Sequence, residues 1–533
     1  MGPVGNGNRR RSGLLIPLFS CPSSTSWGIG EIGDLAAVTA WLAAAGQSVL
    51  QLLPLNEMAP GQQSPYSAMS ALAIDPIFIR LSHVLEFAGL GGEDAVLGAG
   101  DRQRLAAVRA APRVEYAEVR RLKQMAFRAA FDRFHEIEWV ADTHRARALR
   151  DFVAAEAWWI DDYALFRALH DREGGRPWTE WPEPLKARDP GALDRARGEL
   201  AREMIFHQYL QWLADSQWRG ARRIARANGV ELFGDLPFMV DGDSADVWAD
   251  QASFRLDVSV GVPPDAFSAT GQDWGMPLYQ WDAIAEGGFT WLQSRARRSA
   301  MLFDGYRVDH LVGFYRTYGR PREVGPAGPG FFSPAEEAHQ VALGERVLTL
   351  MREPGAEIIA EDLGIVPDFV HASLARLGVP GFRVFRWERL WHEPGQPFRD
   401  PVTYPALSVA TTGTHDTEPL ALWWEHAPPE ERAQVAALPT AGGVLARPEL
   451  FDGAFTPIVR DALLEALFAS GSDLLLFPVP DVFGWRDRIN TPATVDDRNW
   501  SFRLPWPIDQ LEDVPEARER RARLREWTTR HQR

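Results

Sequence analysis

Near the middle of the chain stands the run Phe303-Asp304-Gly305-Tyr306-Arg307-Val308-Asp309-His310, which has strand length, carries apolar residues at Phe303, Tyr306 and Val308 and ends on charged residues. Most runs of this kind in the chain are apolar at consecutive positions, which is typical of strands that are buried on both faces of a parallel sheet. We therefore predict a strand over Phe303–Val308. The charges at its carboxyl end are costly to bury unless they are paired or in use, so the run also marks a candidate site.

Seven further runs have strand length, most with the same pattern, and helical patterns separate most of them. They are Leu14–Leu18, Val49–Leu53, Val230–Phe233, Glu357–Ala360, Phe382–Phe385, Ser408–Thr412 and Leu474–Val479. One helix is expected over Leu35–Ala45, and another is expected to begin at the capping-box pattern Ser333-Pro334-Ala335-Glu336, with proline at the first helical position. Eight strands alternating with helices predict an α/β fold, the (β/α)8 TIM barrel.

The spacing of these strands is uneven. More than 170 residues separate the second run from the third, and they are rich in Ala, Arg, Glu and Trp. Helical periodicity covers much of this stretch, over Tyr116–Phe131, Thr143–Leu169 and Gly198–Asn228. We predict a large, mostly helical insertion between strands two and three, roughly residues 86–225, standing over one face of the barrel. Residues 1–85 then hold the first two strands, and residues 226–533 hold the rest of the barrel with its active-site loops.

Composition narrows the classes of function. The 533 residues include 57 Lys and Arg against 72 Asp and Glu, a formal net charge of −15. That balance disfavours nucleic acid as a partner, because phosphate binding needs clustered basic residues. No apolar run approaches the roughly 18 residues of a membrane span. Cys21 is the only cysteine, which excludes an internal disulfide and fits a cytoplasmic protein.

Carboxylates follow several of the predicted strands, where a barrel carries its active site. They are Asp235, Asp309, Glu361 with Asp362, Asp416 and Asp481. Any one of them fits the N-cap of the following helix. The group as a whole favours a catalytic rim, since Arg307 precedes Asp309 by two residues and shares its strand face.

Converging carboxylates in a chain with 21 Trp, 28 Phe and 9 Tyr indicate sugar chemistry. Cleaving a glycosidic bond with retention needs a carboxylate nucleophile and a carboxylic acid about 5–5.5 Å apart. We expect Arg307 to keep Asp309 ionised, and burial beside Asp362 to keep Glu361 protonated. Most tryptophans, including Trp158, Trp159 and Trp212, are expected to pack in the core.

Three weaker interpretations remain open. Gly28-Ile29-Gly30-Glu31-Ile32-Gly33 matches a dinucleotide-binding pattern, but it does not follow its strand directly and lacks the later acidic residue. His310 and His415 make a metal-dependent hydrolase conceivable, although neither belongs to a short-range ligand pair, so no metal is assigned. A non-catalytic sugar-binding protein would need no carboxylic acid of raised pKa.

Ordered sequence blocks, from about Gly13 to Trp506, also resemble a known family, the 4-α-glucanotransferases (amylomaltase or disproportionating enzyme; glycoside hydrolase family 77) of the α-amylase clan. The resemblance is weakest in the helical insertion. The blocks include Ser64-Pro65-Tyr66, Gly234-Asp235-Leu236-Pro237-Phe238, Asp243-Ser244-Ala245-Asp246-Val247-Trp248, Gly261-Val262-Pro263-Pro264-Asp265, Gly271-Gln272-Asp273-Trp274-Gly275, Arg307-Val308-Asp309-His310, Ala360-Glu361-Asp362-Leu363-Gly364, Thr414-His415-Asp416-Thr417, Arg488-Ile489-Asn490 and Asn499-Trp500.

The resemblance implies Asp309 as the nucleophile, Glu361 as the general acid/base and Asp416 as the carboxylate that stabilises the transition state. It implies six substrate-binding residues as well. They are Tyr66, which stacks on the sugar, the neighbouring Asp235, Arg307, His415, Trp274 and Ser64. The chain departs from the family pattern at Met276, Pro480 and Ala493, which concerns acceptor choice and loop geometry rather than the three acids.

The reaction implied by the resemblance moves α-1,4-glucan segments to glucose or maltooligosaccharide acceptors and needs no cofactor and no metal. The alternative is an α-amylase-like retaining hydrolase. Transfer requires a cover that keeps water out, and we expect residues 261–274 to form it, with Phe267 and Trp274 as stacking surfaces. The sequence specifies neither the smallest donor nor the oligomeric state.

Overall fold

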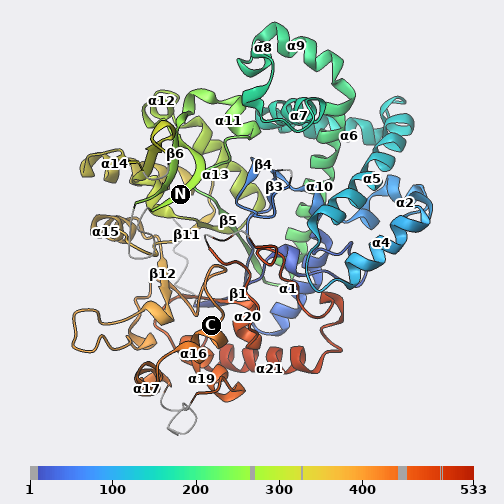
Figure 1. Ribbon diagram of the computed structural model, residues 1–533. Helices are drawn as coiled ribbons and strands as arrows, with labels where there is room; N and C mark the ends of the chain where they lie inside the picture. Colours follow the sequence, from blue (N-terminus) through green and yellow to red (C-terminus); the bar gives the residue numbers. More distant parts are fainter. Residues whose placement is uncertain are drawn as a thin grey trace, which may run out of the picture.

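The structure is a computed structural model that describes residues 10–59, 61–263, 271–325, 328–441, 453–492, 494 and 496–533. Its centre is a closed barrel of eight parallel strands in the order β1-β14-β13-β12-β11-β8-β5-β2 (Figure 1). These strands are β1 (Arg11–Leu15), β2 (Val49–Gln51), β5 (Glu231–Leu236), β8 (Gly305–Val308), β11 (Glu357–Ala360), β12 (Gly381–Val384), β13 (Ser408–Thr411) and β14 (Leu474–Pro478). The predicted TIM barrel is confirmed, and all eight predicted runs supply its strands.

Most strands differ from their predicted bounds by a few residues, and two of them extend beyond the predicted run across charged residues. β1 begins at Arg11 rather than Leu14, and the Arg11 side chain binds Glu231 and Glu357 at the amino end of the barrel. β5 continues to Leu236 because Asp235 lies opposite Arg307 in the neighbouring strand and pairs with it. A charge therefore ends an apolar run in the sequence without ending the strand.

Inward-facing side chains fill the barrel in layers, as in other barrels of this kind. A buried apolar layer is formed by Val49, Phe233, Ile359, Phe382, Val384, Val409, Leu474 and Leu476. Gly305 gives the Phe233 ring its space, since a Cβ at that glycine would lie 2.6 Å from the ring. Because side chains alternate along a strand, the residues two positions after Val49, Phe233 and Ile359 also point inward, at the carboxyl end.

Helices cover the outside of the barrel and connect its strands. Outside the stretch between β2 and β5, the described α-helices are α1 (Leu35–Ala44), α11 (Ala245–Ala249), α12 (Trp281–Glu286), α13 (Thr290–Leu302), α14 (Glu337–Arg352), α15 (Asp368–Leu377), α16 (Leu420–His426), α17 (Pro429–Ala436), α19 (Pro457–Phe468), α20 (Val479–Phe483) and α21 (Pro515–Arg530). The capping-box prediction at Ser333 is wrong. Ser333 ends a strand, where it lies opposite Thr317, and α14 begins only at Glu337 without a side-chain cap.

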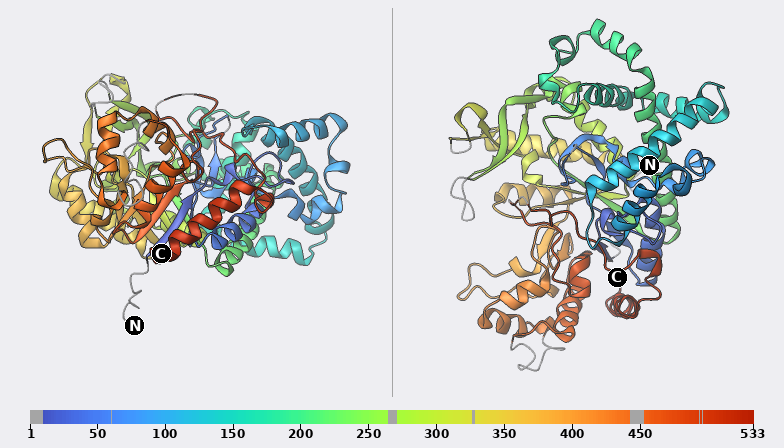
Figure 2. Two further views of the ribbon diagram at one scale, coloured as in Figure 1. Left: turned by 90° about the horizontal axis from the view of Figure 1, so that it is seen from below. Right: turned by 45° about the vertical axis from the view of Figure 1, so that its right-hand side comes forward.

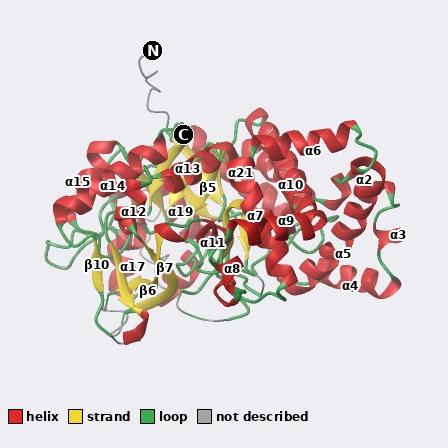
Figure 3. Ribbon diagram, turned by 90° about the horizontal axis from the view of Figure 1, so that it is seen from above, coloured by secondary structure: helices red, strands yellow, loops and turns green. Residues whose placement is uncertain are grey.

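Between β2 and β5 the chain forms a hairpin and then a run of helices. The hairpin is β3 (Asn56–Met58) with β4 (Ala68–Ile74). The helices are α2 (Leu85–Gly89), α3 (Glu93–Val96), α4 (Ala99–Ala110), α5 (Tyr116–Phe134), α6 (His144–Ala155), α7 (Ala157–Arg172), α8 (Glu183–Lys186), α9 (Pro190–Glu199) and α10 (Ala201–Ala227). Most of them gather on one side of the barrel (Figure 3). α10 packs against both α7 and α1, and the domain division at residues 86 and 225 is our proposal.

A second, antiparallel sheet of order β10-β9-β6-β7 lies on another side of the molecule (Figure 2). Its strands are β6 (Phe254–Val262), β7 (Gln272–Tyr279), β9 (Thr317–Pro321) and β10 (Phe331–Ser333). The hairpin of β6 and β7 carries the predicted cover, of which residues 264–270, including Phe267, lie outside the described residues. Among the described residues, no helix is both long and apolar enough to cross a membrane.

Candidate active site

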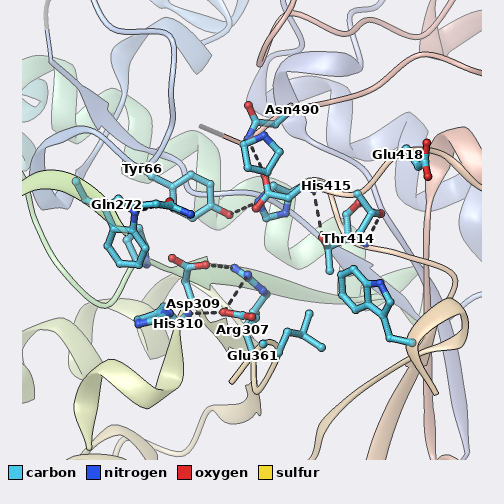
Figure 4. A pocket seen from close by; sticks show the side chains of 18 of the residues that line it. Tyr66, Gln272, Arg307, Asp309, His310, Glu361, Thr414, His415, Glu418 and Asn490 are labelled. Carbon is cyan, nitrogen blue, oxygen red and sulfur yellow. Dashed lines mark hydrogen bonds and ion pairs between the residues drawn. The ribbon is translucent and has the colours of Figure 1, made fainter. Parts of the chain in front are cut away.

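A cavity of about 1640 Å³ is lined by residues at the carboxyl ends of several barrel strands and by the loops that follow them (Figure 4). Its wall includes eight of the nine predicted site residues, namely Ser64, Tyr66, Trp274, Arg307, Asp309, Glu361, His415 and Asp416. The ninth, Asp235, has a fully buried side chain that bonds Tyr66 and Arg307. The structure therefore brings all nine predicted residues together, with Asp235 behind the wall.

The guanidinium of Arg307 connects the acids of this site. Its Nη1 lies 2.8 Å from both carboxylate oxygens of Asp235 and 2.8 Å from Oδ1 of Asp309. Its Nη2 lies 3.8 Å from Oε2 of Glu361. The Arg307 side chain is only 4% exposed, so these charges interact with little water between them. Asp309 and Glu361 are thus held beside one buried cation.

Backbone hydrogen bonds continue the barrel pattern beyond the strand ends and fix both acids. The Asp309 N–H donates to the Leu236 carbonyl at 3.0 Å, and the Glu361 N–H donates to the Val308 carbonyl at 3.1 Å. His310 then adopts the left-handed region with φ of 41°, which is uncommon outside glycine. The His310 N–H donates to Oε2 of Glu361 at 2.7 Å. Sequence reasoning missed this backbone role, since the residue type gives no signal for it.

Glu361 differs electrostatically from an ordinary carboxyl. Burial raises the pKa of Glu361 to about 7, with Arg307 and the His310 N–H opposing the rise and the negative charges of Asp309 and Asp362 adding to it. Near neutral pH both of its protonation states are populated. A carboxyl with this pKa can donate a proton in one step and accept one in the next.

The surroundings of Asp416 lower its pKa, whereas those of Glu361 raise the pKa of that residue. Burial alone would raise its pKa, but His415 and the amide of Asn490 lower the pKa of Asp416 to about 2. His415 Nε2 lies 3.3 Å from Oδ2 of Asp416, and the Asn490 amide donates to Oδ1 at 2.6 Å. Although burial opposes it, Asp416 raises the pKa of His415. Asp416 is therefore held as an anion.

Aromatic rings form one side of the cavity. Tyr66, on the loop between β3 and β4, stacks on His415 with ring centroids 5.5 Å apart and an interplanar angle of 20°. Its hydroxyl donates to Asp235 at 2.7 Å and lies 3.1 Å from Nε2 of His415. Trp500 lies against both rings. Trp500 and Asn490 were absent from the predicted site residues, although both belong to the sequence blocks quoted above.

Two strand-end carboxylates have structural roles instead. Asp362 accepts the Phe382 N–H at 2.7 Å, and Asp481 accepts the Leu420 N–H at 2.7 Å and the Thr412 hydroxyl at 2.5 Å. Neither is part of the cavity wall. Accepting backbone N–H groups is the non-catalytic role that any strand-end carboxylate can take.

Two of the weaker interpretations, the dinucleotide site and the metal site, find little support in the described residues. The glycine-rich segment is packed against its own chain, where a Cβ at Gly30 would lie 1.8 Å from the Leu18 carbonyl oxygen. His310 packs against the rings of Phe238 and Trp274, and burial lowers the pKa of His310 to about 4. Within the described ranges, no group of three His, Cys, Asp or Glu is placed to hold a metal ion.

The barrel places three different acids at its carboxyl end: Glu361, which can gain or lose a proton near neutral pH, the Asp416 anion and Asp309, which is paired with Arg307. This combination of fold and site is typical of the carbohydrate-active barrel enzymes. The family model for 4-alpha-glucanotransferase, glycoside hydrolase family 77, matches residues 16–509. The chain belongs to this family and is an enzyme of the 4-alpha-glucanotransferase type.

Individual relatives agree with this assignment. The chain is 35% identical to a 4-alpha-glucanotransferase of Thermus thermophilus, covering 93% of this chain and 95% of the relative. It is 31% identical to that of Chlamydia pneumoniae, covering 95% and 93%. Among solved structures, amylomaltase from Streptococcus agalactiae in complex with acarbose superposes with a TM-score of 0.82 at 27% identity, covering 98% of this chain and all of that one.

Proposed function

We propose that the enzyme transfers α-1,4-glucan segments to glucose or maltooligosaccharide acceptors by two displacements with net retention. In the first, Glu361 protonates the leaving glycosidic oxygen while Asp309 attacks the anomeric carbon, which gives a covalent β-glucosyl-enzyme and frees the shortened chain. In the second, Glu361 as carboxylate takes the proton of an acceptor 4-hydroxyl, which attacks the anomeric carbon and displaces Asp309. One α linkage is broken and an equivalent one is made.

The observation that carries this proposal is the shared contact of Arg307 with Asp309 and Glu361. Because both carboxyls contact one guanidinium they are near neighbours, and we infer that their separation is the roughly 5–5.5 Å of retaining enzymes. The two carboxyls also differ. Asp309 forms a 2.8 Å ion pair with the cation, whereas Glu361 lies farther from it and has a pKa of about 7. The first suits a nucleophile and the second an acid that becomes a base.

The remaining residues have binding and stabilising roles in this scheme. The Asp416 anion offsets positive charge that develops at the anomeric carbon in the transition state. Tyr66 presents its ring to the sugar, while Asp235 fixes Tyr66 and Arg307 from behind. The solved amylomaltase complex with acarbose supports a sugar chain as the occupant of this cavity.

Transfer rather than hydrolysis requires that sugar contacts replace water at the glucosyl-enzyme. Trp274, at the start of β7, lines the cavity beside His310, and the centroids of the two rings are 5.0 Å apart. Its indole is therefore placed to contact a bound sugar and exclude water. Its Nε1 donates to the Gln272 side chain at 3.1 Å, which fixes the ring. Ser64 shapes the facing loop by accepting the Tyr66 N–H at 3.3 Å.

Incubation with maltotriose tests the proposed reaction. We expect glucose together with a ladder of products longer than maltotriose, because a maltosyl group moved to a second maltotriose gives maltopentaose and glucose. Chromatography of the products over time measures the outcome, and addition of chelator should not change it. Maltose and glucose without longer products would contradict transfer and favour the retaining hydrolase.

A second prediction concerns long donors. Trp387 and Trp391, in the segment after β12, line the same cavity and are 46% and 56% exposed. Exposed indoles in a cavity wall are suited to stacking on the apolar faces of sugar rings. We expect Trp391→Ala to lower kcat/KM for maltoheptaose by about 3- to 10-fold and to leave maltotriose within about 2-fold.

The matched control for this prediction is Trp139→Ala, which removes a tryptophan from the helical insertion beside Arg150. It should leave kcat/KM for both substrates unchanged. An equal loss with maltotriose and maltoheptaose in the Trp391 variant would contradict a role in binding long chains.

A further inference from the structure

A second, very small cavity lies inside the barrel and shares part of its wall with the active site. Its volume is about 10 Å³, enough for about one water molecule. The residues that line it include Gln51, Arg307 and His415 together with apolar side chains of the barrel such as Leu15 and Leu476. Arg307 and His415 also line the large cavity, so the small one touches two residues of the active site from below.

Four polar atoms of this small cavity's residues are buried without a hydrogen-bond partner among the described residues. They are Oε1 and Nε2 of Gln51, Nε of Arg307 and Nδ1 of His415. All three side chains are deeply buried, with 1% of Gln51, 4% of Arg307 and 2% of His415 exposed. Buried polar atoms are nearly always paired, either with protein or with an ordered water molecule.

Gln51 is an unusual residue at its position. It ends β2, lies opposite Leu15 in β1 and Phe233 in β5, and follows Val49 of the apolar layer by two residues. Its side chain therefore points into the barrel, where bulky apolar residues dominate. An amide there requires a polar partner, and the cavity beside it is also lined by Arg307 and His415, each of which has a buried nitrogen without a hydrogen-bond partner among the described residues.

We propose that this small cavity binds one water molecule that links Gln51 to Arg307 and His415. The water accepts the Nε–H of Arg307 and the Nδ1–H of His415 and donates to the amide oxygen of Gln51, which pairs three of the four atoms. Arg307 and His415 use their other nitrogens on Asp309 and Asp416. Gln51 is thus a positioning residue, since it acts on the reacting groups only through the water and these two side chains.

The kinetic part of this inference rests on the proposed function. Misplacing Arg307 or His415 affects the charges that develop in the transition state more than the binding of the ground-state sugar. Removing the amide of Gln51 should therefore lower kcat and change KM little. A merely structural role would instead lower stability and leave the kcat of the folded enzyme unchanged.

The test compares Gln51→Met, which keeps an unbranched side chain of similar length, with Gln47→Met. Gln47 is equally buried just before β2, but its amide nitrogen donates to Thr528 at 2.9 Å and to the Ala45 carbonyl at 3.2 Å, and Gln47 does not line the small cavity. We expect Gln51→Met to lower kcat for maltotriose by about 10- to 100-fold, because misplacing a reacting group by about 1 Å can cost about 100-fold. KM should stay within about 3-fold, and Gln51→Glu, which keeps an oxygen acceptor, should recover part of kcat. Gln47→Met should keep the wild-type kcat, even if its melting temperature falls.

Crystal structures of the wild type and of Gln51→Met at high resolution test the site independently of the reaction. The wild type should show a water about 3 Å from Arg307 Nε and from the Gln51 amide, and the variant should lose it. An empty cavity in the wild type, or a wild-type kcat in Gln51→Met, would overturn the proposal. If the water is found but the protein does not act on glucans, the proposed function fails and the site stands.

Discussion

Asp309→Asn is expected to abolish turnover while the protein stays folded. The substitution keeps the shape of the side chain but removes the charge and the nucleophilic oxygen, so no glucosyl-enzyme can form. We expect kcat for maltotriose to fall by at least about 10⁴-fold, as for other enzymes that lose a nucleophile. Initial rates measure the loss, and circular dichroism with thermal unfolding verifies the fold.

The matched control is Asp304→Asn, the same substitution just before the amino end of the same strand. Asp304 accepts the Leu232 N–H at 3.0 Å and binds Arg222 and Arg226, far from the cavity wall. It should cost stability and leave the kcat of the folded enzyme unchanged. Activity near the wild-type level in Asp309→Asn would rule out the nucleophile assignment.

The barrel was predictable because burial on both faces of a parallel strand leaves a readable signal. The run Glu357–Ala360, for example, is apolar at the consecutive positions Ile358–Ala360 and appears as a strand at the predicted residues. The ends of a strand were harder to predict where a charged side chain is paired with a residue of a neighbouring strand. Arg11 and Asp235 break the apolar pattern, yet both continue a strand because their partners lie on neighbouring strands. Those partners are more than 70 residues away along the chain.

The acids of the site were predictable from their places at strand ends, but their surroundings were not. Which strand-end carboxylates enter the cavity depends on where each side chain points, and the sequence treats Asp416 and Asp481 alike. His310 acts through a left-handed backbone conformation, and Gln51 through the register of β2, neither of which has a local pattern. The cap predicted at Ser333 failed because sheet pairing with Thr317 outweighed a local helix signal.

Glu361→Gln is expected to slow the first displacement by about 10²- to 10⁴-fold with natural glucans, because glutamine cannot protonate the leaving oxygen. A donor whose leaving group needs no proton, such as a maltosyl fluoride, should be affected least. Since Glu361 must carry its proton in this step and has a pKa of about 7, wild-type kcat/KM should fall as the pH rises above about 7. The variant should lose that dependence. Equal slowing of both donors would contradict the acid role.

The same substitution tests the pKa of Glu361 through stability. The folded protein raises it from 4.5 to about 7, so between these values the native state binds more protons than the unfolded chain, and stability falls as the pH rises. At pH 8 the charged carboxyl costs about 3 kcal/mol of unfolding free energy, an order-of-magnitude value. Glutamine carries no such penalty, so Glu361→Gln should gain stability relative to the wild type between pH 5 and pH 8.

The control variant is Glu357→Gln, at the amino end of the same strand. It removes a 2.7 Å ion pair with Arg11 and should not gain stability over this pH range. Parallel unfolding curves for Glu361→Gln and wild type across this pH range would show that the raised pKa is wrong, and the acid that starts the reaction would then have to be sought elsewhere in the cavity.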